Sequence, residues 1–270
     1  MRVLSVNISS LEGDIAGNVA RACETIRAAG PADLVILPEI FTCGYCARDL
    51  TPWAEDVSSP TFATFQALAA ERDCVLGWGF AAPSGVPGKV YNAYAVAEPG
   101  RAPQVYYKTH LHPYLAGHPF NEPEFIIAGD RLGLVETRFG KLGVMICFDG
   151  CFAEVPRCLV LSGARAILWP ARSGGYLAGA GLPRLRALDN IVPILMAEGA
   201  QTGATSLPCH AQLCDHTGAL LAEYQGDTGG CLTAEVDLNA AQTVRETPIS
   251  ATGQYCVRRA ELYGAIAEPR

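Results

Sequence analysis

The sequence predicts one α/β domain in which helices cover the faces of a β-sheet. Strand-like and helix-like patterns alternate along all 270 residues, and 50% of the residues are hydrophobic, which is enough to bury one large core. No linker, low-complexity tract or strict internal repeat interrupts this alternation. We therefore treat residues 1–270 as a single domain.

In the first half of the chain, short apolar runs rich in β-branched residues alternate with helical periodicity. The helix predicted over residues 18–29 carries Val19, Cys23 and Ile26 on one face, and Gly30-Pro31 ends it. The other elements predicted here are a helix over 61–73 and strands over 3–8, 33–37, 74–80, 90–97 and 104–107.

The second half of the chain continues the alternation and ends in strands. Three of these strands are expected to form a closing antiparallel set around the turn His216-Thr217-Gly218. Residues 111–129 and 171–181 show no regular pattern, and long irregular stretches inside a compact domain are usually functional. The predicted elements are strands over 132–138, 143–146, 166–169 and 193–197, helices over 155–162 and 182–191, and closing strands over 210–214, 219–223 and 231–236.

Charge and composition argue against some classes of partner. The net charge is −7 and the pI about 5.3, whereas nucleic acids and anionic membranes attract basic surfaces. No apolar run approaches the length of a membrane span, and Met1 leads into a strand with no signal peptide before it. The eleven cysteines, an odd number, argue against a disulfide framework. We expect a cytoplasmic protein that acts on a small molecule.

Three apolar strands each lead directly to a reactive side chain. Glu39, Lys108 and Cys147 stand within two residues of the end of one such strand. In open α/β sheets, ligands bind outside the carboxyl ends of the strands. We therefore expect a carboxylate, an ammonium and a thiol to meet in one crevice.

These three side chains together suit acyl transfer. A thiolate is a strong nucleophile, but a free thiol is mostly protonated at neutral pH, so a nearby carboxylate is needed to take its proton. An ammonium can stabilise the oxyanion of a tetrahedral intermediate. Each residue also has an ordinary structural explanation, namely a packing cysteine, a capping glutamate and a lysine on an exposed edge, and spacing alone does not decide.

The segments around these residues resemble those of the nitrilase superfamily, the carbon–nitrogen hydrolases. The order of glutamate, lysine and cysteine also matches, and the resemblance covers nearly the whole chain. It implies a four-layer αββα sandwich with the catalytic set Glu39, Lys108 and Cys147. The matching segments are Leu37-Pro38-Glu39 with Phe41-Thr42 and Gly44-Tyr45, Tyr106-Tyr107-Lys108-Thr109-His110-Leu111, and Gly143-Val144-Met145-Ile146-Cys147-Phe148-Asp149.

The resemblance implies further site residues. A second glutamate is expected to position the lysine and the substrate; Glu122 is our choice and Glu124 is the competing candidate. The backbone amide of Phe148 is implied as a second oxyanion donor. Tyr45 begins the loop over residues 45–53, one of the loops expected to bind the substrate and set its identity.

Some positions depart from the family pattern. Cys151 stands where many relatives carry an arginine, which in some of them grips a substrate carboxylate; Arg172 is the candidate to replace that grip in substrate binding. Glu198 stands where asparagine is common, and His210 where a small serine is common. Packing drift is our first explanation for the last two, and a polar or cationic substrate is the second.

The expected reaction is hydrolysis of a non-peptide carbon–nitrogen bond in a small amide or N-carbamoyl compound, through a cysteine thioester. The run Cys147-Phe148-Asp149 looks closer to the amidase and carbamoylase branches than to the nitrile-cleaving branch, which is the alternative enzyme. No cofactor or metal is expected, and the resemblance implies a homodimer or higher homo-oligomer. A zinc-binding or interaction module is the alternative of a different class, with ligands drawn from Cys43, Cys46, Cys209, His210 and Cys214.

Overall fold

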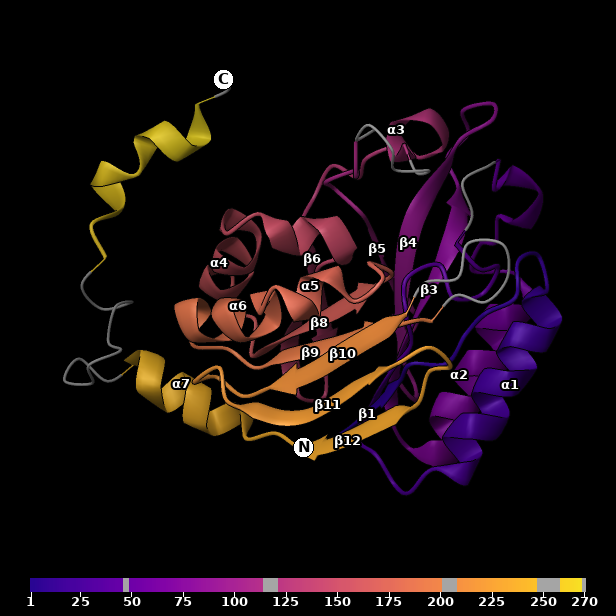
Figure 1. The fold of residues 1–270 in the computed structure, drawn as a ribbon, viewed down its shortest axis with the longest axis horizontal. Helices are drawn as coiled ribbons and strands as arrows, with labels where there is room; N and C mark the ends of the chain where they lie inside the picture. Colours follow the sequence, from indigo (N-terminus) through magenta and orange to yellow (C-terminus); the bar gives the residue numbers. More distant parts are fainter. Residues whose placement is uncertain (46–48, 114–120, 201–207, 247–257, 269–270) are drawn as a thin grey trace.

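The computed structural model describes residues 1–45, 49–113, 121–200, 208–246 and 258–268. Two six-stranded sheets lie face to face, and helices cover the outer face of each (Figure 1). This is a four-layer αββα sandwich in a single domain, so the predicted fold class is confirmed.

The first sheet has the strand order β12-β1-β2-β3-β4-β5. Strands β1, β2 and β3 run parallel to one another, while β4, β5 and β12 are antiparallel to their neighbours. The strands are β1 (Arg2–Val6), β2 (Leu34–Ile36), β3 (Val75–Pro83), β4 (Val90–Ala97), β5 (Gln104–Tyr107) and β12 (Cys231–Glu235).

The second sheet has the strand order β11-β10-β9-β8-β7-β6 and repeats the same scheme, with a parallel centre made of β7, β8 and β9. The outer strands β6, β10 and β11 are antiparallel to their neighbours. The strands are β6 (Gly133–Thr137), β7 (Gly140–Val144), β8 (Ala166–Ala171), β9 (Ile194–Glu198), β10 (Cys209–Cys214) and β11 (Leu220–Gly226).

Helices α1 (Ile15–Ala28) and α2 (Pro60–Arg72) pack on the first sheet, and α4 (Glu154–Leu161) and α6 (Leu182–Asn190) pack on the second. The first sheet and its helices meet through aromatic contacts, such as Phe62 against Trp78 at 5.0 Å between ring centroids. The shorter helical segments are α3 (Glu122–Phe125), α5 (Tyr176–Gly179), α7 (Leu238–Glu246), η1 (Thr51–Trp53), η2 (Cys147–Cys151), η3 (Ala260–Leu262) and η4 (Gly264–Ala267).

Side-chain alternation along each inner strand produces the layers. In β2, Leu34 and Ile36 belong to the core between the two sheets, whereas Val35 packs with the core under α1 and α2. Strands with apolar residues on both faces need cover on both sides, which the opposite sheet and the helices supply. Among the described residues, no helix is both long enough and apolar enough to cross a membrane.

Most predicted strands and helices are confirmed with small shifts at their ends. The closing antiparallel set is a correction: β10 and β11 form a hairpin, but β12 leaves them and pairs with β1 in the other sheet. Local sequence patterns do not show which sheet edge a strand joins, because that pairing depends on contacts between residues far apart in the chain. The helix α7 was not expected, and α3 and α5 lie inside the stretches expected to be irregular.

Candidate active site

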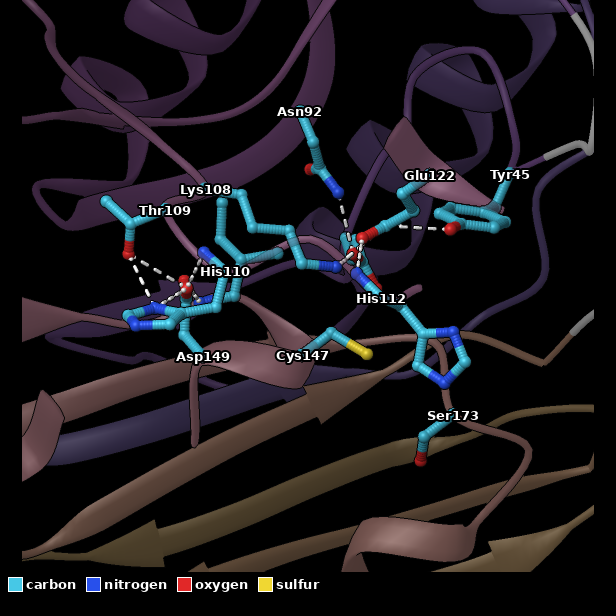
Figure 2. Close-up of polar contacts among 12 residues, drawn as sticks. Tyr45, Asn92, Lys108, Thr109, His110, His112, Glu122, Cys147, Asp149 and Ser173 are labelled. Atoms are coloured by element: carbon cyan, nitrogen blue, oxygen red, sulfur yellow. Dashed lines mark hydrogen bonds and ion pairs between the residues drawn. The ribbon is translucent and has the colours of Figure 1, made fainter. Parts of the chain in front are cut away.

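The three predicted residues stand where their strands end. Glu39 follows β2, Lys108 is the first residue after β5, and Cys147 lies three residues beyond β7 at the start of η2. Since the two sheets face each other, these positions come together in space: Lys108 contacts Glu39 directly, and the charges of both act on Cys147. Figure 2 shows Lys108 and Glu122 above the Cys147 sulfur.

Lys108 is buried between two carboxylates. Its Nζ lies 2.9 Å from Glu39 Oε1 and 2.7 Å from Glu122 Oε1, and all three side chains are 1–2% exposed. Burial by itself lowers the pKa of Lys108, but the charges of Glu122 and Glu39 outweigh it and raise that pKa well above its ordinary value. The lysine is therefore held as an ammonium.

Glu39 lies in a tight turn packed against β3. Gly79 N donates to Pro38 O at 3.1 Å, and a Cβ on Gly79 would lie 2.4 Å from both Pro38 O and Ile40 N. Only glycine therefore allows β3 to approach the turn so closely. Ile40 has φ +44°, an uncommon conformation for a β-branched residue, so the turn is held by its surroundings.

The two oxygens of the Glu39 carboxylate have different surroundings. Oε1 accepts hydrogen bonds from Lys108 Nζ and, at 2.7 Å, from Asn92 Nδ2. Oε2 is buried and has no hydrogen-bond partner among the described residues. Burial raises the pKa of Glu39, the charge of Glu122 adds to the rise, and Lys108 opposes it. The result is a carboxylate with one anchored oxygen and one oxygen that is available to a proton.

Glu122 is the second carboxylate at Lys108. Its Oε1 also accepts from Tyr45 OH at 2.8 Å, and its Oε2 accepts from His112 N at 2.6 Å (Figure 2). Glu124, the competing candidate, is exposed and accepts instead from Asn121 Nδ2 at 2.6 Å. The structure thus places Glu122, and not Glu124, beside the lysine.

Cys147 sits at a strained position. Its φ of +45° is in the left-handed region, which costs a non-glycine residue roughly 1–2 kcal/mol. Trp169 Nε1 on β8 donates to the Cys147 carbonyl at 2.9 Å, and a Cβ on Gly150 would lie 2.1 Å from the Trp169 ring. The turn at Cys147 is therefore supported by Trp169 on β8, and glycine at position 150 leaves room for the Trp169 ring.

The thiol of Cys147 is held in its neutral form at rest. Burial raises its pKa well above the ordinary value and the Glu39 carboxylate raises it further, whereas Lys108 and a hydrogen bond from the Arg172 backbone N–H lower it. The residue as a whole is half-buried. To become a nucleophile, this thiol has to give its proton to a neighbouring base.

Asp149 links the turn at Cys147 to the segment that carries Lys108. One oxygen accepts from Ile146 N and from Tyr106 OH, each at 2.8 Å, and the other accepts from His110 N at 2.8 Å and Thr109 Oγ1 at 3.0 Å (Figure 2). Burial alone raises its pKa, but the His110 ring, whose Nδ1 lies 3.0 Å away, and then the Ile146 N–H outweigh burial, so the pKa is lowered. The sequence carried a signal for this role, since Asp149 is a charged residue shortly after a buried strand end.

The predicted substrate-binding residues lie around this centre. Tyr45 contacts Glu122, and the half-buried Phe148 ring packs edge-on against His112 at 5.0 Å between centroids. The buried Arg172 guanidinium donates to Ser10 Oγ at 2.7 Å and to Ala200 O at 3.3 Å, while its backbone N–H faces the Cys147 sulfur.

Asn92, Asp149 and His112 were not assigned roles from the sequence. Asn92 carried a usable signal, because it is a polar residue inside the apolar strand β4, and a buried amide there needs a partner. His112 acts through its backbone N–H, which no side-chain pattern reports.

No group of three or more His, Cys, Asp or Glu side chains in the described part of the chain could hold a metal ion. Of the zinc ligands considered above, Cys46 lies outside the described residues. Cys209 Sγ donates to Glu198 O at 2.9 Å, and Cys214 is buried in the apolar core.

Comparisons with known proteins identify the class. The family model described as carbon-nitrogen hydrolase matches residues 2–246, and the chain therefore belongs to the carbon–nitrogen hydrolase family. It is an enzyme that hydrolyses carbon–nitrogen bonds, and the predicted membership of the nitrilase superfamily is confirmed.

Among curated relatives, the human omega-amidase NIT2 is 29% identical over 259 residues, which cover 91% of each chain. The omega-amidase NIT2-A of Xenopus laevis is 30% identical over 243 residues, covering 85% of this chain and 86% of the relative.

Among solved structures, Saccharomyces cerevisiae Nit3, a member of branch 10 of the nitrilase superfamily, has a TM-score of 0.80 at 26% identity and covers 93% of this chain and 95% of its own. The carbon-nitrogen hydrolase from Helicobacter pylori has a TM-score of 0.86 at 21% identity, covering 100% and 98%, which supports the fold.

Proposed function

We propose that the chain is an amidase in which Cys147 is the nucleophile, Glu39 the general base and acid, and Lys108 the oxyanion stabiliser. The observation that carries this proposal is the buried Lys108 ammonium, shared by Glu39 and Glu122 and acting electrostatically on the Cys147 sulfur. Two carboxylates, one ammonium and one thiol in a single buried cluster are the groups that acyl transfer requires.

In the first half-reaction, Glu39 Oε2 takes the thiol proton and the sulfur attacks the amide carbon. The carbon–sulfur bond forms as the carbonyl π electrons move to oxygen, and Lys108 Nζ with the Phe148 backbone N–H stabilises the resulting oxyanion. As the tetrahedral intermediate collapses, the carbon–nitrogen bond breaks and Glu39 gives its proton to the departing amine. A thioester on Cys147 remains.

In the second half-reaction, Glu39 takes a proton from water, which attacks the thioester carbon. The sulfur leaves, regains a proton from Glu39, and the carboxylic acid is released. Tyr45 and His112 hold Glu122, so Glu122 keeps Lys108 in place through both steps. Glu122 is thus a positioning residue for the ammonium.

The proposed substrate is a small linear amide or an N-carbamoyl compound. Two observations support it: the run Cys147-Phe148-Asp149, and the omega-amidases among the relatives. We propose that Arg172 contributes to substrate binding through its backbone beside Cys147. Its guanidinium already donates to two protein acceptors.

The proposal includes a homodimer that works in the cytoplasm. All nine cysteines in the described residues are free thiols, which suits a reducing compartment. Leu161 on α4 and Leu185 and Leu188 on α6 are 45–48% exposed, and they would be covered if two copies paired across these helices. Light scattering on the purified protein tests the dimer.

The experiment that tests the function is an ammonia-release screen over linear amides, N-carbamoyl compounds and nitriles. Wild type should release ammonia from an amide or carbamoyl compound and show an acyl adduct on Cys147 by intact mass, whereas Cys147→Ala should show neither. Cys151→Ala is the matched control and should keep both signals. Release from nitriles alone would select the nitrilase alternative, and full activity in Cys147→Ala would overturn the mechanism.

A further inference from the structure

Glu198 is a fully buried carboxylate at the end of β9, outside the Glu39, Lys108 and Glu122 cluster. Its Oε1 accepts from Ser173 N at 2.6 Å, from Ser173 Oγ at 2.5 Å and from Gly175 N at 3.3 Å. Its Oε2 accepts from His210 N at 2.9 Å. No Lys, Arg or His side chain in the described residues forms a salt bridge with it, although the charge of the buried Arg172 guanidinium acts on it from nearby.

The main chain of Glu198 is also held on both sides. Its N–H donates to Asn7 Oδ1 at 2.9 Å, and its carbonyl accepts from Cys209 Sγ at 2.9 Å. Asn7 follows β1 in the other sheet, so Glu198 is fixed relative to both sheets. A side chain anchored in this way can set the position of whatever binds its two oxygens.

What it positions is the segment Arg172–Gly175, which follows β8 and lies beside the reactive centre. Figure 2 shows Ser173 on the side of the site where His112 and the Cys147 sulfur lie. The residue before Ser173 is Arg172, whose backbone N–H lies near enough to the Cys147 sulfur to lower the pKa of its thiol. A displacement of Ser173 therefore moves a donor that stabilises negative charge on the nucleophile.

We propose that Glu198 is a positioning residue for Cys147: by binding Ser173 N and Gly175 N it holds the Arg172 N–H against the sulfur. This role differs from substrate binding, because both oxygens of Glu198 are already occupied by protein donors. It also explains the departure from asparagine at this position. Three backbone N–H groups can only donate, so each side of the side chain has to accept, which a carboxylate does and an amide does not.

His210 has a related but separate role. Its backbone N–H binds Glu198, while its ring Nε2 lies 2.7 Å from Glu223 Oε1 on β11. A Cβ on Gly175 would lie 3.1 Å from His210 Cβ, so His210 packs against the same segment that Glu198 binds. Glu223 is partly exposed and touches no backbone N–H of residues 172–175, which makes it a matched control carboxylate.

The inference rests on the proposed role of Cys147 as nucleophile, and its test reads the thiol without turnover. Alkylation of Cys147 by iodoacetamide is followed across pH by peptide mass spectrometry in wild type, Glu198→Gln, Ser173→Ala and Glu223→Gln. In Glu198→Gln, an NH₂ group replaces one of the two carboxylate oxygens. It then faces either Ser173 N and Gly175 N or His210 N, all of which are donors and cannot accept from it. The midpoint of alkylation should rise by about one pH unit, the size of one hydrogen bond to a charged group.

On the amide found by the screen, Glu198→Gln should lower kcat about tenfold with little change in KM, because the affected donor faces the sulfur. Ser173→Ala removes the Oγ donor to Glu198 and the acceptor of Leu177 N but keeps the backbone bonds, so its midpoint and kcat should change in the same direction as in Glu198→Gln, by less. Glu223→Gln leaves residues 172–175 untouched and should keep the wild-type midpoint and kcat.

A lower melting temperature in Glu198→Gln with a wild-type alkylation midpoint and wild-type kcat would show that Glu198 only stabilises the fold, and the inference would be wrong. If Glu198→Gln does not fold, Glu198→Asp replaces it: it keeps the charge but falls short of one set of donors, so a wild-type midpoint there equally overturns the inference. Failure of Cys147 as nucleophile is seen separately, as activity in Cys147→Ala.

Discussion

Glu39 and Asp149 are both buried carboxylates within the active site, yet their surroundings shift their pKa values in opposite directions. Both oxygens of Asp149 accept from backbone and side-chain donors, and its pKa is lowered. Glu39 has one unpartnered oxygen among the described residues and a like charge nearby in Glu122, and its pKa is raised. The saturated carboxylate suits a structural role, and the unsaturated one suits proton transfer.

The largest expected effect is on Glu39. Glu39→Gln keeps the shape and can still accept from Lys108 and Asn92, but it cannot take a proton. Single-turnover acylation should slow by about 10⁴-fold, the upper end for general acid–base catalysis. The double variant with Cys147→Ala should be little worse than Cys147→Ala alone, because residues that act as one unit are not additive.

Lys108→Ala should come next. It removes the charge that stabilises the oxyanion, which costs roughly 3–4 kcal/mol of transition-state stabilisation, measured as loss of kcat/KM. Unlike Glu39→Gln, it also leaves Glu39 and Glu122 buried without their shared cation, so unfolding should become easier. Equal melting temperatures for Lys108→Ala and wild type would contradict this view of the cluster.

Asp149→Asn should lower the stability of the fold, whereas Glu39→Gln should not. Its NH₂ has to face donors such as Ile146 N or His110 N, so the free energy of unfolding should fall by about 1–3 kcal/mol in denaturant titrations. Glu39→Gln should leave stability unchanged or higher, because burying that charge is unfavourable. A stable Asp149→Asn protein alongside an unstable Glu39→Gln protein would refute the comparison.

The stability difference at Asp149 should depend on pH with a definite sign. The folded-state pKa of Asp149 is lowered from 3.8, so its ionised form stabilises the fold above the unfolded pKa, and that stabilisation is lost as pH falls through the folded value. The gap between wild type and Asp149→Asn should therefore close in acid. Glu39, with a raised pKa, should instead place the acid limb of kcat/KM above pH 4.5.

The smallest effect separates the two neighbouring glutamates. Glu122→Gln can still accept from both Tyr45 OH and Lys108 Nζ through its carbonyl oxygen, so acylation should slow by about tenfold, less than in Glu39→Gln. Glu124→Gln should behave like wild type, because its exposed side chain bonds only to Asn121 among the contacts described. Near-normal acylation in Glu39→Gln, with loss in Glu122→Gln, would mean that the base is the other carboxylate.

The sequence alone determined most of the strands and longer helices and the places of the three reactive residues. Apolar runs and helical periodicity are local properties, and a residue that directly follows a strand stays at its end wherever the strand packs. The positions of Glu39, Lys108 and Cys147 therefore follow from local patterns, with the resemblance supplying their joint role.

Only the tertiary structure decided which groups surround them. Glu122 rather than Glu124 contacts Lys108, and β12 pairs with β1 in the first sheet rather than with the β10-β11 hairpin in the second. The sequence did not decide either outcome, because both depend on segments far apart in the chain. Asp149 and Glu198 bind backbone N–H groups, and every residue except proline carries one, so no side-chain pattern marks their partners. The two oxygens of a carboxylate acquire their roles from such donors, and donors are placed by packing.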